Sequence, residues 1–252
     1  MPLLYEPGPA RDRHTILVSE EFTSATPPAH LHAPEADPPG AAGSDADPAA
    51  RAVGVGPWTG EWPTQEHYDP ELLATGDRRN VVDEYRYWKL ESIVADLDTR
   101  RSPLHVGIEN WGRDFNIGSV VRTANAFNVA AVHIIGRRRW NRRGAMVTDR
   151  YLHVFHHETV AEFVAWAREA GVEVLGVDNV PGSVPLEHRP LPRKAVMVFG
   201  EEGPGLSEEM RAAAAEVVHI TQHGSTRSIN AGAAAAVAMW AWMLQHGDPG
   251  KG

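Results

Sequence analysis

Three short stretches of this sequence carry more polar side chains than a helix or a turn requires. Asn116 and Arg122 are six residues apart, Glu201 stands beside a run of glycines, and Ser228 and Asn230 precede an alanine-rich run. A helix needs one capping side chain, whereas the segment before Ala231 offers four candidates. This surplus predicts groups that serve a binding or catalytic site as well as the helix.

The first stretch, from Asn116 to Phe127, has helical character. Asn116 can cap this helix, and Arg122 follows nearly two turns later, close to the same face. An arginine on the buried side of an otherwise apolar helix needs an anionic partner. The spacing fits equally well a surface arginine paired with Asp114, so the residues alone leave both interpretations open.

The second stretch is GEEGPGLSEEM, which begins at Gly200 and places further glycines at 203 and 205. Glycines allow a tight turn or a close approach of the backbone to a ligand. The stretch is neither a Walker A loop nor a G-x-G-x-x-G fingerprint. A structural alternative is a turn into a helix capped by Ser207, and that helix is expected in either case. Glu201 is unusual, because the end of a strand seldom needs a carboxylate beside glycines.

A basic loop, GRRRWNRRG, spans residues 136–144 and directly follows an apolar run. Arginines pair with phosphates, and an aromatic ring among them can stack on a base. We therefore predict a nucleic-acid-binding loop, with a solvated charge run as the alternative. The residues predicted to make these contacts are Arg137, Arg138, Arg139, Trp140, Arg142 and Arg143.

The histidines in YLHVFHHE raise the question of a metal site. Strand alternation would place His153 and His157 on one face and His156 on the other. No carboxylates or cysteines accompany them in a ligand pattern, and the chain has no cysteine at all. We expect no metal and no disulfide.

Strands and helices alternate along the second part of the chain. Short β-rich apolar runs occur at 104–110, 131–136, 172–178, 194–200 and 216–220. Between and after them lie helical patterns at 117–127, 159–171, 207–216 and 231–247. This alternation predicts an α/β fold with a mostly parallel sheet and helices on both faces. Ligands of such sheets bind at the carboxyl ends of the strands, which is where all three polar stretches lie.

Charge and proline divide the chain. Residues 1–77 carry 13 acidic residues against three arginines, a net −10, whereas the remaining residues carry 20 acidic and 21 basic ones, a net +1. We predict an acidic, Pro/Ala-rich and partly disordered extension at 1–77, an amphipathic helix at 78–102, the main domain at 103–246 and a tail at 247–252. An acidic extension repels nucleic acid, so any surface that binds nucleic acid is expected on the rest.

The three polar stretches, taken in order, resemble the motifs of the SPOUT superfamily, and within it those of the TrmH-like RNA 2′-O-ribose methyltransferases. The similarity rests on N-x-G-x-x-x-R-T-A-x-A-F from Asn116, F-G-E-E-G-x-G-L at 199–206 and I-x-x-x-G-x-x-x-S-I-N at 220–230. It covers about residues 103–246. It implies a deep trefoil knot in the C-terminal part, a rare exception to the rule against knots.

The resemblance also implies the cofactor, the partners and the roles of residues. S-adenosylmethionine would be bound by Phe199, Gly200, Glu201, Gly203, Ile220, Ser228, Ile229 and Asn230. Catalysis on a ribose of tRNA or rRNA would involve Arg122, Asn116, Glu201, Ser228 and Asn230. Such enzymes are usually homodimers, which would suit the final helix with Trp240 and Trp242, although ordinary core packing explains these side chains as well.

Some positions depart from the family pattern. Thr221-Gln222 stands where Pro-Met is common, which leaves a catalytically inactive knotted RNA-binding protein as an alternative. Asn128 replaces a usual glycine, and asparagine tolerates the left-handed conformation required there. An oxidoreductase on a Rossmann-like sheet is a third possibility, but the sequence lacks that glycine fingerprint. Without a long apolar run or a secretory signal, we expect a soluble cytoplasmic protein.

Overall fold

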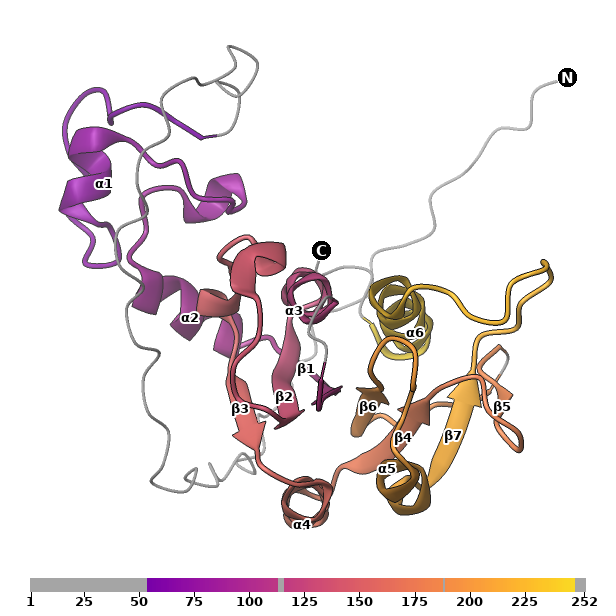
Figure 1. Cartoon of the computed structure of the whole chain (residues 1–252). Helices are drawn as coiled ribbons and strands as arrows, with labels where there is room; N and C mark the ends of the chain where they lie inside the picture. Colours follow the sequence, from indigo (N-terminus) through magenta and orange to yellow (C-terminus); the bar gives the residue numbers. More distant parts are fainter. Residues whose placement is uncertain (1–53, 113–115, 188, 248–252) are drawn as a thin grey trace, which may run out of the picture. The chain divides into compact units, whose positions relative to one another are not determined.

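The computed structural model describes residues 54–112, 116–187 and 189–247, which all belong to a compact unit that spans 42–252. The greater part of the predicted acidic extension, residues 1–53, and most of the predicted tail lie outside the described residues. Residues 103–247 contain a sheet between two layers of helices, and residues 54–101 form an irregular segment that precedes it (Figure 1).

The described residues form one seven-stranded sheet in which all neighbouring strands are parallel, in the order β3-β2-β1-β6-β4-β7-β5. The five predicted strands are confirmed, and two short strands, β3 and β5, are added. The strands are β1 Ser102–Asn110, β2 Val129–Gly136, β3 Val154–His157, β4 Glu173–Val177, β5 Val184–Pro185, β6 Ala195–Phe199 and β7 Glu216–His219. The three polar stretches follow β1, β6 and β7. These three strands lie close together in the sheet, in the consecutive set β1-β6-β4-β7.

Helices cover both faces of the sheet, as predicted. Helices α3 (Ile117–Ala126) and α6 (Ala231–His246) lie on one face, and α4 (Val160–Ala170) and α5 (Glu208–Ala213) lie on the other (Figure 1). Short 3-10 helices follow β2 at Arg142–Ala145 and Thr148–Tyr151. The predicted cap at Ser207 is present, because its side chain accepts a hydrogen bond from Met210 N. Among the described helices, none is both long and apolar enough to cross a membrane.

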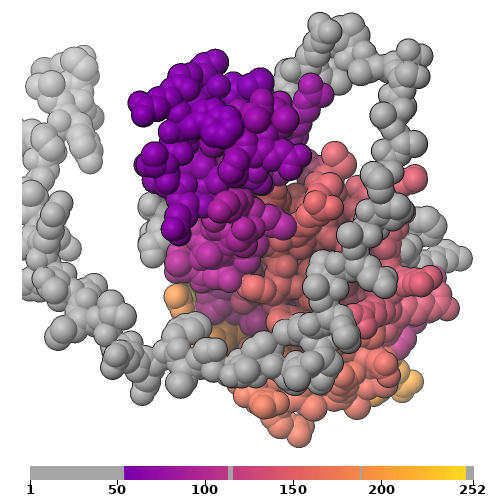
Figure 2. All heavy atoms as spheres, turned by 90° about the vertical axis from the view of Figure 1, so that its left-hand side faces the viewer, coloured from indigo at the N-terminus to yellow at the C-terminus, as the bar shows by residue number. Residues whose placement is uncertain are grey.

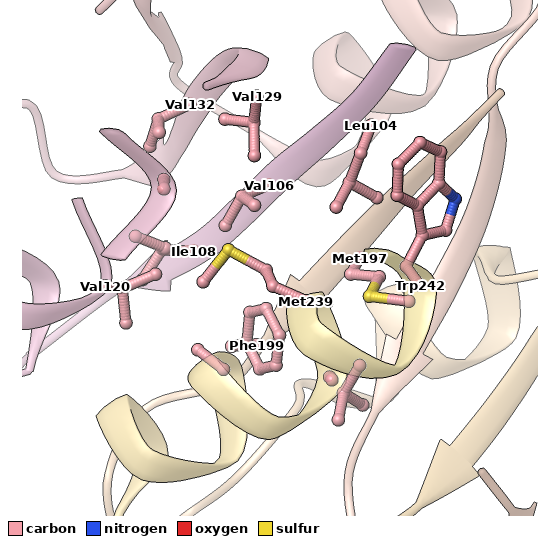
Figure 3. Close-up of a cluster of buried hydrophobic side chains, with 14 of the residues drawn as sticks. Leu104, Val106, Ile108, Val120, Val129, Val132, Met197, Phe199, Met239 and Trp242 are labelled. Atoms are coloured by element: carbon pink, nitrogen blue, oxygen red, sulfur yellow. The ribbon is translucent and has the colours of Figure 1, made fainter. Parts of the chain in front are cut away.

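Alternate residues of the strands point to opposite faces of the sheet and belong to two separate hydrophobic clusters. Met197 and Phe199 of β6 join Val106 and Ile108 of β1 under α3 and α6, together with Met239 and Trp242 (Figure 3). Val196 and Val198 point to the opposite side and pack with Phe163 and Met210 of α4 and α5. This two-sided burial explains the continuous apolar runs of the central strands, since a parallel strand covered on both faces has no solvent side.

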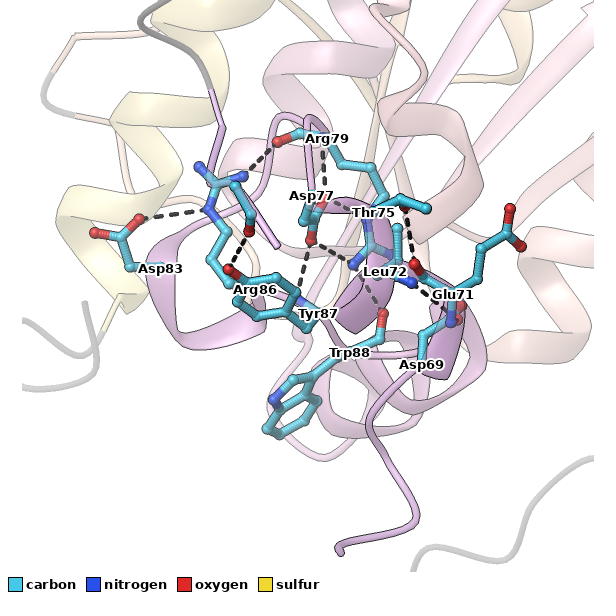
Figure 4. A network of polar contacts seen from close by, with 11 residues as sticks. Asp69, Glu71, Leu72, Thr75, Asp77, Arg79, Asp83, Arg86, Tyr87 and Trp88 are labelled. Atoms are coloured by element: carbon cyan, nitrogen blue, oxygen red, sulfur yellow. Dashed lines mark hydrogen bonds and ion pairs between the residues drawn. The ribbon is translucent and has the colours of Figure 1, made fainter. Parts of the chain in front are cut away.

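The predicted helix over 78–102 is wrong in its length. The structure contains α1 at Pro70–Thr75, a 3-10 helix at Asp83–Tyr85 and a nine-residue α2 at Leu90–Asp98. The cause is Asp77, which is fully buried and accepts hydrogen bonds from Arg79 N, Arg79 Nε and Tyr87 N (Figure 4). These bonds hold the chain in turns, and Tyr87 takes a left-handed φ of 63° that ends any helix there.

The segment before β1 is attached to the sheet domain by defined contacts. Tyr85 and Ile93 form a small core with Tyr151, and Arg101 donates hydrogen bonds to Asn128 Oδ1 at 3.1 Å and to Tyr151 O at 2.9 Å. Figure 2 shows residues 54–101, from indigo to purple, as a continuous surface beside the paler atoms of the sheet domain. Asn128 has a φ of 46°, which confirms the predicted left-handed conformation. The knot stays a prediction.

Candidate functional site

The main cavity lies at the carboxyl ends of β4, β6 and β7 and has a volume of about 330 Å³. It is bounded by the glycine-rich stretch, by the loop after β7 and by the beginning of α6. All eight residues predicted from the resemblance to bind a cofactor line it: Phe199, Gly200, Glu201, Gly203, Ile220, Ser228, Ile229 and Asn230. The lining also contains Gln222 of the unusual Thr221-Gln222 pair and three polar residues that the sequence did not single out, namely Asp178, Asn179 and His219.

The glycine-rich stretch folds back on itself. A Cβ on Gly200 would lie 2.0 Å from the carbonyl carbon of Gly205, so no larger residue fits there. Gly205 has a φ of 73° and donates its N–H to Glu201 O at 2.9 Å. The next N–H, on Leu206, donates to Asp178 Oδ2 at 2.8 Å. The close approach predicted for these glycines is therefore in part backbone against backbone, with Gly203 left open toward the cavity.

A buried carboxylate holds the start of α5 against the end of β1. Glu109 is 1% exposed and accepts hydrogen bonds from Ser207 N and Ser207 Oγ, both at 2.7 Å, and from Trp111 Nε1 at 2.9 Å. Three hydrogen bonds satisfy the carboxylate without a cation. No local pattern in the sequence marks Glu109, because only the pairing of β1 with β6 brings it next to Ser207.

Asn116 and Asn230 join the three stretches through their side chains. Asn230 caps α6 by accepting from Gly232 N at 2.9 Å and Ala233 N at 3.2 Å, and it donates from Nδ2 to Asn116 Oδ1 at 2.9 Å. Asn116 in turn donates to Glu202 Oε2 at 2.9 Å. The predicted capping by Asn116 is wrong, because its backbone is already helical and its side chain makes no cap hydrogen bond.

Arg122 is exposed on α3, so of the two interpretations left open by the spacing the structure favours a surface arginine. It does not line the 330 Å³ cavity, and within the described residues it has no hydrogen bond or ion pair; Asp114 lies outside them. Ser228 is also exposed and lines the cavity, while α6 is capped by Asn230 instead. Glu201 accepts a hydrogen bond from Gly112 N and so connects the first stretch to the second.

The unusual pair Thr221-Gln222 has a local explanation. Thr221 donates from N at 2.8 Å and from Oγ1 at 2.9 Å to the carboxylate of Glu187. Burial raises the pKa of Glu187, but hydrogen bonds from its own backbone N–H and from Thr221 outweigh burial and leave the pKa lowered. Gln222 Oε1 is buried without a hydrogen-bond partner among the described residues, although Gln222 lines the cavity.

The basic loop lies beside the first stretch. Arg137, Arg138 and Arg139 are exposed, and Arg137 donates from N to Asn110 O at 2.7 Å and from Nη1 to Gly112 O at 3.3 Å. Trp140 is only partly exposed and packs on the main hydrophobic cluster, with the Arg142 guanidinium 5.7 Å from its ring centroid. Arg142 also approaches Asp149 at 3.6 Å, while Arg143 is exposed in the adjoining 3-10 helix.

The three neighbouring histidines make separate contacts. His153 meets Asp98 at 2.9 Å, His156 meets Gly136 O at 2.7 Å, and His157 meets His133 at 2.9 Å. His133 continues to His105 at 3.1 Å, which makes a row of three imidazoles across β1, β2 and β3. Among the described residues no group of His, Asp or Glu is arranged to hold a metal ion.

Comparisons with known proteins agree with this geometry. Residues 103–240, more than half of the chain, match the model of the SpoU rRNA Methylase family. The tRNA (guanosine(18)-2′-O)-methyltransferase of Escherichia coli (strain K12) is 25% identical over 161 residues, which are 62% of this chain and 70% of that protein. An uncharacterized tRNA/rRNA methyltransferase of Mycolicibacterium vanbaalenii is 30% identical over 187 residues, covering 67% of this chain and 56% of its own length.

Solved structures show the same fold. The A. aeolicus TrmH/SpoU tRNA modifying enzyme matches with a TM-score of 0.55 at 19% identity, covering 62% of this chain and 81% of its own. The SpoU methyltransferase AviRb from Streptomyces viridochromogenes, in complex with AdoMet, matches with a TM-score of 0.52 at 23% identity, covering 60% and 63%. The three ordered stretches, the cavity at which they meet and the matching family model place this chain in the SpoU rRNA methylase family of RNA methyltransferases.

Proposed function

We propose that this protein transfers the methyl group of S-adenosylmethionine to a ribose 2′-hydroxyl of tRNA or rRNA. The observation that carries the proposal is the meeting of the first, second and third polar stretches through Asn116, Glu202 and Asn230 at the edge of one cavity. The names of the relatives support a tRNA or rRNA substrate, and the E. coli relative is named for 2′-O-methylation of a guanosine.

The cavity fits S-adenosylmethionine in size and in chemistry. Its volume of about 330 Å³ lies within the range of small-molecule sites. Gln222 Oε1 lacks a donor, and the cofactor carries two amino groups that can supply one. The backbone around Gly200 and Gly203, with Ile220 and Ile229, would hold the cofactor, which when bound supplies an electrophilic methyl group. The open cavity does not favour the inactive alternative.

Arg122 would act on the RNA at the reacting oxygen. Methyl transfer is an in-line displacement, so the protein must position the hydroxyl and stabilise the negative charge that develops on it. An arginine stays protonated and therefore does not serve as the base. Arg122 is exposed and has no partner among the described residues, so it is available to bind a phosphate next to the target ribose. Asn116, Ser228 and Asn230 would orient the hydroxyl, and Glu201 holds the first stretch in place.

Replacement of Arg122 tests this assignment. We expect Arg122→Ala to lower methyl transfer to total RNA by about 100- to 1000-fold, the usual loss for one donor at a developing charge. Cofactor affinity, measured by calorimetry, should stay unchanged. Labelled S-adenosylmethionine followed by a search for alkali-resistant dinucleotides would report the 2′-O product. Arg168→Ala, an exposed arginine of α4, is the matched control. Near-normal turnover in Arg122→Ala would refute the role.

RNA would be held mainly by the basic loop. Arg137, Arg138 and Arg139 are exposed and follow β2 at the same edge of the sheet as the cavity. Arg142 and Arg143 extend this charge, while Trp140 supports the loop from the core side. Residues 1–77 carry a net negative charge and would repel RNA, so the RNA would bind to the main domain.

We also propose a homodimer that uses α6. Trp242 is buried in the core, but Val237, Trp240 and Leu244 are 44%, 54% and 68% exposed and recur at helical spacing. A second copy of this chain would cover the exposed stripe. In this arrangement 103–246 is the methyltransferase domain, 78–102 and 1–77 are accessory segments, 247–252 is a tail, and the enzyme acts on cytoplasmic RNA.

A further inference from the structure

The indole of Trp111 is held at the surface by a buried hydrogen-bond partner and a close backbone contact. Trp111 is 37% exposed, although its Nε1 donates a 2.9 Å hydrogen bond to the buried carboxylate of Glu109. The ring lies over Gly136, where a Cβ would come within 2.6 Å of the indole carbon Cε3. Gly136, with a φ of 104°, therefore leaves the space that the ring occupies. Trp111 belongs to none of the three hydrophobic clusters of the described residues.

Trp111 lies at the edge of the sheet where the three polar stretches meet. The next residue, Gly112, donates its N–H to Glu201, and its carbonyl oxygen accepts a hydrogen bond from Arg137 Nη1 at 3.3 Å. Trp111 therefore lies between the second stretch and the basic loop. Its only polar atom is already bonded to Glu109, which leaves the apolar ring surface for other contacts. Trp111 does not line the 330 Å³ cavity, so the cofactor does not explain it.

We propose that Trp111 is a stacking platform for a nucleobase of the RNA substrate. Arg137, Arg138 and Arg139 would pair with the phosphates of the same strand, because an aromatic face beside arginines is the usual arrangement for single-stranded nucleic acid. The platform positions the nucleotide at the edge where Asn116, Glu201 and Asn230 meet. The inference rests on the proposed function, since it requires that the partner is RNA.

Base-dependent binding tests the platform. The full chain is titrated by fluorescence anisotropy with labelled single-stranded oligoadenylate and with an abasic ribose-phosphate strand of equal length. We expect Trp111→Leu to weaken oligoadenylate binding by about 5- to 100-fold, as for the loss of one stacked base. Binding of the abasic strand should change by less than about two-fold, because phosphate contacts remain. Trp111→Phe should restore most of the affinity, and Trp62→Leu, 47% exposed in the N-terminal segment, should have no effect.

The alternatives give different results. A purely structural role through Nε1 and Glu109 would make Trp111→Phe as poor as Trp111→Leu and would weaken both strands equally, which overturns the proposal. Equal affinity of the unaltered protein for the two strands also overturns it. Failure of the proposed function is a separate result, namely that the unaltered protein binds bases through Trp111 but transfers no methyl group from S-adenosylmethionine to RNA.

Discussion

At the scale of single residues, the polar groups of the site differ in how many hydrogen bonds they already make within the protein. Asn116, Asn230 and Glu109 use their side chains for internal hydrogen bonds between distant segments. Arg122 and Ser228 make none within the described part of the chain and are exposed. A guanidinium that makes no internal ion pair has all its N–H donors available to bind a phosphate. This is the physical basis of the role proposed for Arg122.

The imidazole row makes stability depend on pH. Burial lowers the pKa of His105 and of His157 to about 4, and burial together with these two neighbours lowers the pKa of His133 well below its usual 6.5. The folded protein keeps these rings neutral, whereas the unfolded chain binds protons below about pH 6.5. The free energy of unfolding should therefore decrease as the pH is lowered from 6.5 to 4, by up to about 1.4 kcal/mol per pH unit for each ring.

Urea unfolding at several pH values measures this slope. His157→Phe removes one titrating ring and should reduce the slope by up to about 1.4 kcal/mol per pH unit. His223→Gln, which changes an exposed histidine, should leave the slope as it is. If His157→Phe showed the same slope as the unaltered protein, the row would not be the source of the acid sensitivity.

At the scale of elements, the site depends on a few close backbone contacts. The first turn of α3 packs directly on the loop after β2, since a Cβ on Gly118 would lie 2.7 Å from Ala145 N and 2.8 Å from Gly144 Cα. Gly232 at the start of α6 similarly lies against Ser119, where a Cβ would be 3.1 Å from Oγ. These glycines let α3, α6 and the basic loop approach one another, which sets the distance between Arg122 and the arginines proposed to bind phosphate.

Gly118→Ala should therefore destabilise the protein despite the higher helix propensity of alanine. Its Cβ would meet backbone atoms that cannot rotate away, and overpacking of this kind costs about 1 to 3 kcal/mol. The midpoint of urea unfolding measures the loss. Gly56→Ala is the matched control, because a Cβ at that position meets no atom within 4 Å, and a change of less than about 0.5 kcal/mol is expected. An unchanged midpoint in Gly118→Ala would mean that the loop shifts freely.

At the scale of the whole molecule, charge and apolar surface are separated along the chain. The net negative charge is concentrated in 1–77, a run of exposed arginines follows β2, and an exposed apolar stripe lies along α6. A stripe of three large side chains is more than scattered surface hydrophobicity and is typical of an interface. The proposed dimer would thus bury α6 while the basic loop stays open to RNA.

Trp240→Glu tests this arrangement. A charge at the centre of the stripe would be buried without a partner, so we expect sedimentation or light scattering to change from the mass of a dimer to that of a monomer. Val82→Glu changes a 62% exposed residue of the N-terminal segment and should leave the mass unchanged. A monomer in the unaltered protein would contradict the dimer.

The sequence by itself determined the alternation of strands and helices and the order of the three polar stretches. These features follow from local patterns, because periodicity reports burial and glycine reports backbone conformation. Eight of the residues that line the cavity were indicated by the resemblance of these stretches to the motifs of a known family. The local patterns mispredicted the segment 78–102 and the cap at Asn116, where buried Asp77 and the side chain of Asn230 compete with helix propensity. Only the tertiary structure could decide the places of Glu109, Trp111, Gln222 and the imidazole row. The structural role of each depends on a contact between strands or loops that are far apart in the chain, and a local sequence pattern does not predict such a contact.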